Sequence, residues 1–326
     1  MAVRALLAAA VAAVAATGVV LAGANGTAGS GWVALAPATL ERTEVAAGRI
    51  GRWIYVVGGF ERSSGSPSAA VERYDIRRDR WTRVRSMPTA LHHATAAVRS
   101  GRLYVHGGYG GTTADWQPRA TLFEYTPERD RWRRLPSAPT ARAAHAAGIV
   151  GGRLYAAGGS TREGSVRSMD VYDFTRRQWT RGTRFPGPAR NHLTGTAAGA
   201  RLYVFGGRER ENFSVAARFD PDTGRWSRLP PLRVPRGGIA AVPLPGGRIA
   251  VFGGEELGPG GRTIAPVELY DIRRRRWSRL PEMRTPRHGL GGAVLGRRVY
   301  AVEGGAQPGF HFSDAVEALE VSAERR

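Results

Sequence analysis

The sequence predicts an all-β fold, a six-bladed β-propeller built from four-stranded antiparallel blades, and three observations predict it. A glycine pair closes a short apolar run six times, at intervals of about 50 residues, which is the period of a propeller blade. In five of these periods an aromatic residue is followed by tryptophan seven positions later. The sixth period lacks that tryptophan, whereas Trp32 stands as an extra one before the first period.

Each glycine pair follows a strand-like run, as Gly107-Gly108 follows Leu103 to Val105. A small-residue run, Thr95 to Val98, precedes that strand, and Thr121 to Tyr125 and the segment from Trp132 supply two more. Short β-rich runs separated by Gly, Pro and Asp turns predict a four-stranded antiparallel sheet. Such a sheet has two apolar faces, so radial stacking against neighbours is needed to bury both. The six pairs are Gly58-Gly59, Gly107-Gly108, Gly158-Gly159, Gly206-Gly207, Gly253-Gly254 and Gly304-Gly305.

The spaced aromatic residues place a large ring on each of the two outer strands, where it fills the widening gap between blades. They are Tyr74/Trp81, Tyr125/Trp132, Tyr172/Trp179, Phe219/Trp226 and Tyr270/Trp277. With the glycine pairs, they resemble the kelch repeat, whose signature is a diglycine followed by spaced Tyr and Trp. The resemblance covers essentially all of residues 32–322. It implies a propeller that serves as a binding scaffold or, in a few members, as an enzyme.

Spacing also predicts how the ring closes. Trp32 precedes Gly58 by the same interval that separates Trp81 from Gly107. The segment from Trp32 to Leu35 is therefore expected as the outer strand of the last blade, paired with Ala315 to Val321, which removes every free edge from the ring. The alternative is an isolated N-terminal strand beside a frayed sixth blade.

The N-terminus is typical of an export signal. Arg4 precedes a long run of apolar and small residues, and Ala22-Gly23-Ala24 fits the small-x-small cleavage pattern. We therefore expect residues 1–24 to be a signal peptide and residues 25–326 to be the propeller, although an uncleaved anchor is the alternative. The mature product is expected to be periplasmic, cell-surface or extracellular, to lack a membrane span and to be a monomer.

Composition excludes several chemistries. Cysteine is absent, which excludes disulfides, thiolate nucleophiles and thiolate metal sites, and lysine is absent, which excludes Schiff-base catalysis. The net charge of +21 therefore comes entirely from arginine. These arginines recur at turns throughout the chain, which favours a coding bias over one polyanion-binding block, so no specific nucleic acid is expected. The expected partner is an acidic glycan or an acidic protein segment.

A repeated arginine in the connections between blades is the main candidate for ligand binding. In a propeller these side chains would surround the mouth of the central channel, where guanidinium groups bind carboxylates and other anions. The alternative is a structural clamp on loop carbonyls or on Glu72, Asp170, Glu268 or Glu317. The candidates are Arg42, Arg142, Arg190, Arg236 and Arg287, with Leu91 in their place in the second blade.

Histidines and one glutamate lie near the same mouth. His93, His145, His192 and His288 precede inner strands, but because they belong to separate blades we expect several ångströms between them and no metal site. His93, His145 and His192 are candidates for ligand binding. Glu303 is one extra residue at the end of an apolar strand, which predicts a bulge that directs its carboxylate toward the channel. Glu303 is therefore the candidate for acid–base catalysis.

The variable loops share this face and carry Trp116, Phe213 and Phe310, whose rings would either stack on a ligand or fold back onto their own loops. No phosphate-binding glycine loop, nucleophile elbow or metal-binding helix appears, and no cofactor is expected. The resemblance to copper–radical kelch enzymes fails because cysteine is absent. We therefore expect an exported binding module that holds an acidic partner or glycan through this loop face. The alternative is a cofactor-independent enzyme on an anionic sugar, similar to the sialic-acid mutarotase type.

Overall fold

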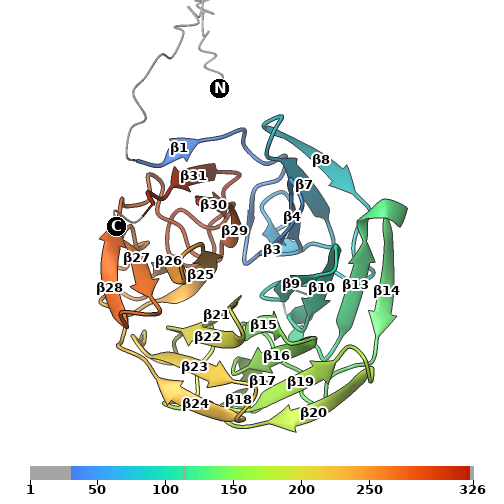
Figure 1. The fold of residues 1–326 in the computed structure, drawn as a ribbon. Helices are drawn as coiled ribbons and strands as arrows, with labels where there is room; N and C mark the ends of the chain where they lie inside the picture. Colours follow the sequence, from blue (N-terminus) through green and yellow to red (C-terminus); the bar gives the residue numbers. More distant parts are fainter. Residues whose placement is uncertain (1–30, 113–114, 324–326) are drawn as a thin grey trace, which may run out of the picture.

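The computed structural model describes residues 31–112 and 115–323, which form six four-stranded antiparallel sheets arranged in a ring (Figure 1). We call these sheets blades 1–6 in chain order. The innermost strands of successive blades contact one another around the axis, and the innermost strand of blade 6 contacts that of blade 1. The predicted all-β architecture of four-stranded antiparallel blades is confirmed.

In the first three blades the strands follow the chain order from the axis outward. Blade 1 contains β3 (Ala46–Ile50), β4 (Trp53–Val57), β7 (Val71–Asp75) and β8 (Arg80–Val84). Blade 2 contains β9 (Thr95–Arg99), β10 (Arg102–His106), β13 (Leu122–Thr126) and β14 (Arg131–Leu135), with the single-turn 3-10 helix η1 (Pro127–Arg129) between its outer strands. Blade 3 contains β15 (Ala146–Val150), β16 (Arg153–Ala157), β19 (Met169–Asp173) and β20 (Gln178–Gly182).

The other three blades repeat the order. Blade 4 contains β21 (Thr194–Ala198), β22 (Arg201–Phe205), β23 (Ala216–Asp220) and β24 (Arg225–Arg228). Blade 5 contains β25 (Gly237–Leu244), β26 (Arg248–Glu255), β27 (Val267–Asp271) and β28 (Arg276–Leu280). Blade 6 contains β29 (Gly291–Leu295), β30 (Arg298–Val302), β31 (Val316–Glu320) and, outermost, β1 (Val33–Ala34) from the other end of the described chain.

Short strands extend from the loops between the second and third strands of the blades. In blade 1 these are β5 (Phe60–Glu61) and β6 (Ser66–Pro67), and β5 pairs both with β6 and with β2 (Arg42–Thr43) of the preceding connection. Blade 2 adds the hairpin of β11 (Tyr109–Thr112) and β12 (Asp115–Pro118), and blade 3 adds β17 (Ser160–Thr161) and β18 (Gly164–Ser165). We call the side that bears these loops and the connections between blades the loop face.

The innermost strands are rich in Ala, Gly and Thr because the blades converge at the axis. At Gly48 in β3 an added Cβ would lie 2.6 Å from the side chain of Leu103 in the next blade, and at Gly148 it would lie 2.8 Å from that of Leu202. Further out, six apolar clusters fill the six gaps between neighbouring blades. Each blade therefore buries both faces against its neighbours, as the repeat requires.

Tryptophans of the outermost strands link each blade to the preceding one. Each indole Nε1–H donates to a backbone carbonyl of the segment that leaves the preceding blade. The pairs are Trp81 to Ala36, Trp132 to Arg85, Trp179 to Pro136, Trp226 to Thr183, Trp277 to Pro230 and Trp32 to Pro281. A buried or half-buried indole with a satisfied N–H thus recurs at all six junctions.

The closure of the ring agrees with the prediction. Strand β1 pairs antiparallel with β31, with Val33 opposite Ala318 and Ala34 opposite Glu317. The Leu35 N–H extends this pairing by donating to the carbonyl of Val316 at 2.9 Å. Figure 1 shows β1 and β31 side by side in this blade. The predicted signal peptide, residues 1–24, lies outside the described residues, and within them no helix has the length and apolar character needed to cross a membrane.

Replacing Trp32 by alanine tests this closure. The indole is 7% exposed, packs at 5.9 Å from Phe252 and donates to Pro281, so we expect Trp32→Ala to lower the free energy of unfolding by about 3–5 kcal/mol. Val33→Ala in the same strand is the control, because Val33 is 47% exposed and should change stability by less than about 0.5 kcal/mol. Chemical denaturation followed by circular dichroism measures both. Equal effects of the two changes would contradict the assigned closure.

Candidate functional site

Two sets of equivalent positions surround the channel on the loop face, one member of each per blade. The first set lies in the connections, just before the innermost strands. It consists of Glu44, His93, Ala144, His192, Gly238 and Gly289, all of which have positive φ. The second set follows the two residues at the diglycine position and consists of Phe60, Tyr109, Ser160, Arg208, Glu255 and Gly305.

Backbone hydrogen bonds hold the first set together around the channel. The N–H of His93 donates to Glu44, that of Ala144 to His93 and that of Gly238 to His192, at 2.9–3.0 Å. Gly289 donates to Gly238, and Val45 N–H donates to the Gly289 carbonyl across the closure at 3.1 Å. Positive φ is uncommon for residues other than glycine and is costly for Glu44, so these positions are fixed by the ring.

The second set is aligned with the first by β-bridges between each loop and the connection that precedes its blade. His92 bridges to Tyr109, Asn191 to Arg208 and Gly237 to Glu255. The chemistry of the mouth therefore changes from blade to blade on a constant backbone. It is aromatic over blades 1 and 2 and charged over blades 4 and 5.

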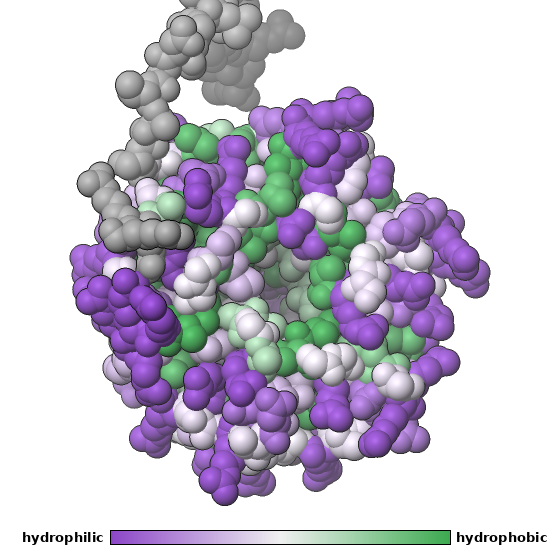
Figure 2. Space-filling view, in the orientation of Figure 1, coloured by the Kyte–Doolittle hydropathy of each residue, from purple (hydrophilic) through white to green (hydrophobic). Residues whose placement is uncertain are grey.

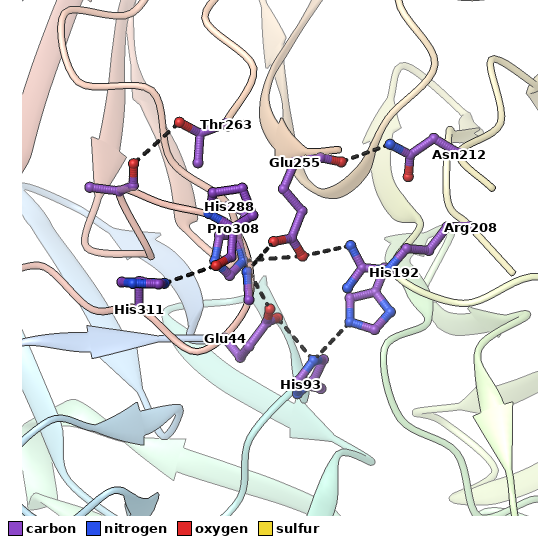
Figure 3. Close-up of polar contacts among 12 residues, drawn as sticks. Glu44, His93, His192, Arg208, Asn212, Glu255, Thr263, His288, Pro308 and His311 are labelled. Atoms are coloured by element: carbon purple, nitrogen blue, oxygen red, sulfur yellow. Dashed lines mark hydrogen bonds and ion pairs between the residues drawn. The ribbon is translucent and has the colours of Figure 1, made fainter. Parts of the chain in front are cut away.

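The charged side is a connected group that we call the mouth cluster: Glu44, His93, His192, Arg208, Glu255 and His288 (Figure 3). His93 Nε2 lies 3.2 Å from Glu44 Oε2 and 2.9 Å from His192 Nε2. His288 Nδ1 lies 3.3 Å from Glu44 Oε1 and 3.5 Å from Glu255 Oε1. Arg208 donates to Glu255 Oε1 at 2.6 Å, and the Gly309 N–H from the blade 6 loop donates to Glu255 Oε2 at 2.7 Å.

The protonation states in this cluster follow from burial and from its charges. Burial alone would raise the pKa of Glu44, but His93, His288 and His192 hold it well below its usual value. Burial lowers the pKa of His93 and of His192, against the attraction of Glu44. His288 differs, because its hydrogen bond to Glu44 and the charges of Glu44 and Glu255 outweigh burial and raise its pKa. At neutral pH the mouth therefore holds an ionised Glu44 beside two neutral imidazoles.

The aromatic side is a second group, which we call the aromatic wall: Phe60, His92, Tyr109, Trp116 and Phe310. The buried Phe60 ring is central, with ring centroids 3.9 Å from His92, 5.0 Å from Trp116 and 4.9 Å from Phe310. Trp116 is 39% exposed and Phe310 is 48% exposed, so both rings present area to solvent. The wall adjoins the mouth cluster, because Phe60 also contacts the His93 ring at 6.3 Å.

The channel along the axis contains a cavity of ≈ 370 Å³. Its lining includes Glu44, His93 and His192 together with the small residues of the innermost strands. Figure 2 shows the ring hollowed at its centre, with apolar and weakly polar side chains around the hollow and hydrophilic ones at the rim. A volume of this size accepts a small ligand.

The expected ring of arginines at the mouth is not found. The five repeated arginines are fully buried and clamp the blades instead. Arg142, for example, donates to the carbonyls of Gly158 at 2.7 Å and Ser168 at 3.0 Å and pairs with Asp170 at 2.9 Å. Its own carbonyl accepts from Gly108 of the preceding blade. Arg42, Arg236 and Arg287 make the corresponding bonds with Glu72, Glu268 and Glu317, which is the clamp that the sequence left as the alternative.

Blades 2 and 4 lack part of this arginine clamp, and their substitutes show what the clamp does in the other blades. In blade 2 the arginine and the acid are replaced by Leu91 and Phe123, which lie in one apolar cluster. In blade 4 the acid is absent, and Arg190 donates to the carbonyls of Gly206, Pro186 and Pro188 and lies over the Phe185 ring. Burial, with a smaller effect of Arg167, lowers the pKa of Arg190 to about 10. The arginine clamp therefore has a packing role, and in blade 2 the apolar pair of Leu91 and Phe123 takes its place.

The prediction of a bulge at Glu303 is wrong. Strand β30 has the same length as β22, and Glu303, with φ 53°, takes the place of the first glycine of the pair. Its N–H donates to Ala315, as Gly58 N–H donates to Ala70. The side chain is fully buried at the junction of blades 6 and 1, where Arg42 donates to it at 2.8 Å. Glu303 lies outside the lining of the channel cavity and is not placed for catalysis there.

The candidate histidines separate into two groups. His93, His192 and His288 belong to the mouth cluster, and the expectation of several ångströms between them is wrong, because two of the rings touch. His145 is buried, 2.9 Å from His106 and 3.0 Å from Thr95, at the junction of blades 2 and 3.

Trp116 and Phe310 join the aromatic wall. Phe213 lies half-buried in the blade 4 loop, apart from the wall, and accepts a backbone bond from Arg236.

Sequence reasoning missed Glu44, Arg208 and Glu255 as members of a site. A signal existed, because each occupies a fixed offset in the repeat: Glu44 lies two residues after a clamp arginine, and Arg208 and Glu255 directly follow a glycine pair. Comparing these offsets among the six blades would have selected them.

A ring of six four-stranded antiparallel blades with variable loops on one face defines a β-propeller scaffold. A family profile described as the KLHDC2/KLHL20/DRC7 Kelch-repeats domain matches residues 44–254. The chain therefore belongs to the kelch-repeat family and is a kelch-repeat interaction module. Among solved structures, the chain is similar to that of YjhT, with a TM-score of 0.74 over 87% of this chain and 96% of the YjhT chain. At 17% sequence identity, this similarity shows the shared fold alone.

Among curated proteins the chain is similar to Kelch-like protein terF of Aspergillus terreus, with 29% identity over 297 residues that cover 86% of this chain and 64% of that protein. It is also similar to Beta-scruin of Limulus polyphemus, with 28% identity over 73% of this chain and 27% of that protein. The chain thus spans less than two thirds of the length of these relatives.

Exchange of one clamp for its apolar substitute tests the structural role of the arginines. Arg142→Leu leaves Asp170 buried without its partner, so we expect a loss of about 3–5 kcal/mol in the free energy of unfolding. Adding Asp170→Phe reproduces the Leu91/Phe123 pair of blade 2 and is expected to recover part of that loss. Arg153→Ala is the control, because this arginine is 47% exposed and its pair with Asp173 contributes less than about 1 kcal/mol. A double variant no more stable than Arg142→Leu would contradict the substitution.

Glu303 gives the structure a pH dependence. Burial raises the pKa of Glu303 to about 7 although Arg42 opposes it. Between pH 4.5 and 7 an unfolded Glu303 ionises while the folded one stays protonated, so its contribution to stability is lost as pH rises. We expect Glu303→Gln to gain about 2–3 kcal/mol relative to the parent protein between pH 5 and 8. Thermal unfolding at the two pH values measures this, and a difference independent of pH would refute it.

Proposed function

We propose that this chain is an exported binding module that holds a glycan at the mouth of its channel, between the aromatic wall and the mouth cluster. The single observation that carries the proposal is the division of one mouth into two chemistries. Trp116 and Phe310 present half-exposed rings, supported from behind by Phe60. Beside them, the mouth cluster carries the carboxylates of Glu44 and Glu255 and the guanidinium group of Arg208.

A sugar ring matches this arrangement because it has apolar C–H faces and hydroxyl groups around its edge. The faces pack on aromatic rings, and the hydroxyls donate to carboxylates and accept from guanidinium groups. The cavity of ≈ 370 Å³ is sized for one or two sugar units. Arg208 is also placed to receive a carboxylate if the sugar is acidic.

Binding is favoured over catalysis by the positions of the residues on which an enzyme would depend. The mutarotase-like alternative required Glu303 and at least two of the repeated arginines in one solvated pocket. All of them are buried at junctions between blades, with the arginines bonded to loop carbonyls. Export rests on residues 1–24, whose pattern supports a cleaved signal peptide and a periplasmic, cell-surface or extracellular product.

The test is a glycan array of acidic and neutral oligosaccharides, probed with the protein from residue 25 onward at two salt concentrations. Titration calorimetry then compares the parent protein with Trp116→Ala and Phe310→Ala on the best oligosaccharide. We expect each change to weaken binding about tenfold, since an aromatic stacking contact contributes about 1 kcal/mol beyond its buried area.

Leu257→Ala is the matched control, because Leu257 is a 56% exposed apolar side chain in the blade 5 loop. It should leave the affinity unchanged. The proposal would be refuted if the protein bound no glycan on the array. It would also be refuted if a Trp116→Ala/Phe310→Ala double variant bound as the parent protein does. Loss of binding at the higher salt concentration alone would indicate charge attraction instead of stacking.

A further inference from the structure

Three donor atoms from three blades converge in the mouth cluster. Glu44 Oε2, His93 Nε2 and His192 Nε2 all lie within 4.8 Å of one another, with the two imidazole nitrogens 2.9 Å apart. These residues occupy the same repeat position in blades 1, 2 and 4. At the corresponding positions of blades 3, 5 and 6 stand Ala144, Gly238 and Gly289, so no bulky side chain competes for the space.

Hydrogen bonding fixes one of the imidazoles. Asn191 donates through Nδ2 to Ser165 at 2.8 Å and to Glu209 at 3.3 Å, so its Oδ1 accepts from His192 Nδ1–H. The lone pair of neutral His192 is therefore on Nε2, directed at His93. His93 Nδ1 has its own partner, His92 Nδ1 at 2.6 Å.

Hydrogen bonds alone do not satisfy the three converging atoms, Glu44 Oε2, His93 Nε2 and His192 Nε2. A hydrogen on His93 Nε2 meets two acceptors, Glu44 Oε2 and His192 Nε2, and serves only one of them well. A cation at this point satisfies all three lone pairs together. Two imidazoles and one carboxylate form a ligand set for borderline divalent transition metals, with bonds of about 2.0–2.2 Å.

We propose that Glu44, His93 and His192 bind one divalent transition-metal ion of the zinc class at the mouth of the channel. The other Glu44 oxygen is held by His288 at 3.3 Å, and Asn191 and His92 orient the two histidines, so each ligand has an outer partner. The three ligands line the channel cavity, which leaves the remaining coordination position open to it. A hydroxyl or carboxylate of a ligand in the channel would complete the coordination.

Zinc alone is the probe. Untagged protein from residue 25 onward is stripped with a chelator, incubated with Zn²⁺, desalted and analysed by elemental mass spectrometry, and Co²⁺ is added in parallel for its visible spectrum. We expect about one zinc per chain and the intense visible bands of cobalt in a low-coordinate site. Fe²⁺ and Ni²⁺ arms under anaerobic conditions rank the metals.

Glu44→Gln and His192→Gln each remove one ligand with little change in volume and are expected to weaken zinc binding at least tenfold. His311→Gln is the matched control, since His311 is exposed on the neighbouring blade 6 loop, and it should bind as the parent does. Circular dichroism verifies the fold, and because the two ligand variants lie on different blades, failure of one to fold leaves the other to decide.

If the parent protein holds no zinc after the incubation, a proton lies between these three side chains instead of a metal ion, and the proposal is overturned. Zinc retained equally by Glu44→Gln and His192→Gln places the ion elsewhere and also overturns it. This inference goes beyond glycan binding and fails separately from it, because Trp116→Ala and Phe310→Ala should leave zinc affinity unchanged.

Discussion

The closure of the ring is the constraint on which the rest of the structure depends. Two residues of β1 complete the sixth blade, and Trp32 repeats there the indole bond that joins every other pair of blades. Without this junction the first and last blades would each expose an apolar face. The hydrogen bond from Val45 to Gly289 and the pair of Arg42 with Glu303 cross the junction of blades 6 and 1, so the geometry of the mouth depends on closure as well.

The clamp arginines show why a repeated charged residue does not by itself mark a binding site. Each donates to the carbonyl of the first residue at the diglycine position, at the end of the second strand of its blade. In four blades the arginine also pairs with a buried acid, so these groups are bonded inside the scaffold. A buried ion pair of this kind is exchangeable with an apolar pair, as Leu91 and Phe123 show. The site that we propose lies instead where equivalent positions differ from blade to blade.

The mouth illustrates this division. The β-bridges recur in every blade and backbone hydrogen bonds link most neighbouring connections, whereas the side chains at these positions range from glycine to arginine. The aromatic wall draws residues from blades 1, 2 and 6, and the mouth cluster draws polar and charged residues from blades 1, 2, 4, 5 and 6. They meet because the ring brings residues as distant in sequence as Glu44 and His288 into contact. A rigid scaffold with positive φ at these positions can hold such groups without rearrangement.

The sequence by itself determined the period, the four strands of each blade, the register of the aromatic pairs and the closure by the segment after Trp32, because these depend on local patterns that repeat. It also supplied the acids that pair with the clamp arginines. Only the tertiary structure decided which way each side chain points. It placed Glu303 at a junction because the residue replaces a glycine instead of extending a strand, and it turned His145 inward while joining His93 to His192. Such contacts depend on the curvature of the ring, which no single repeat encodes.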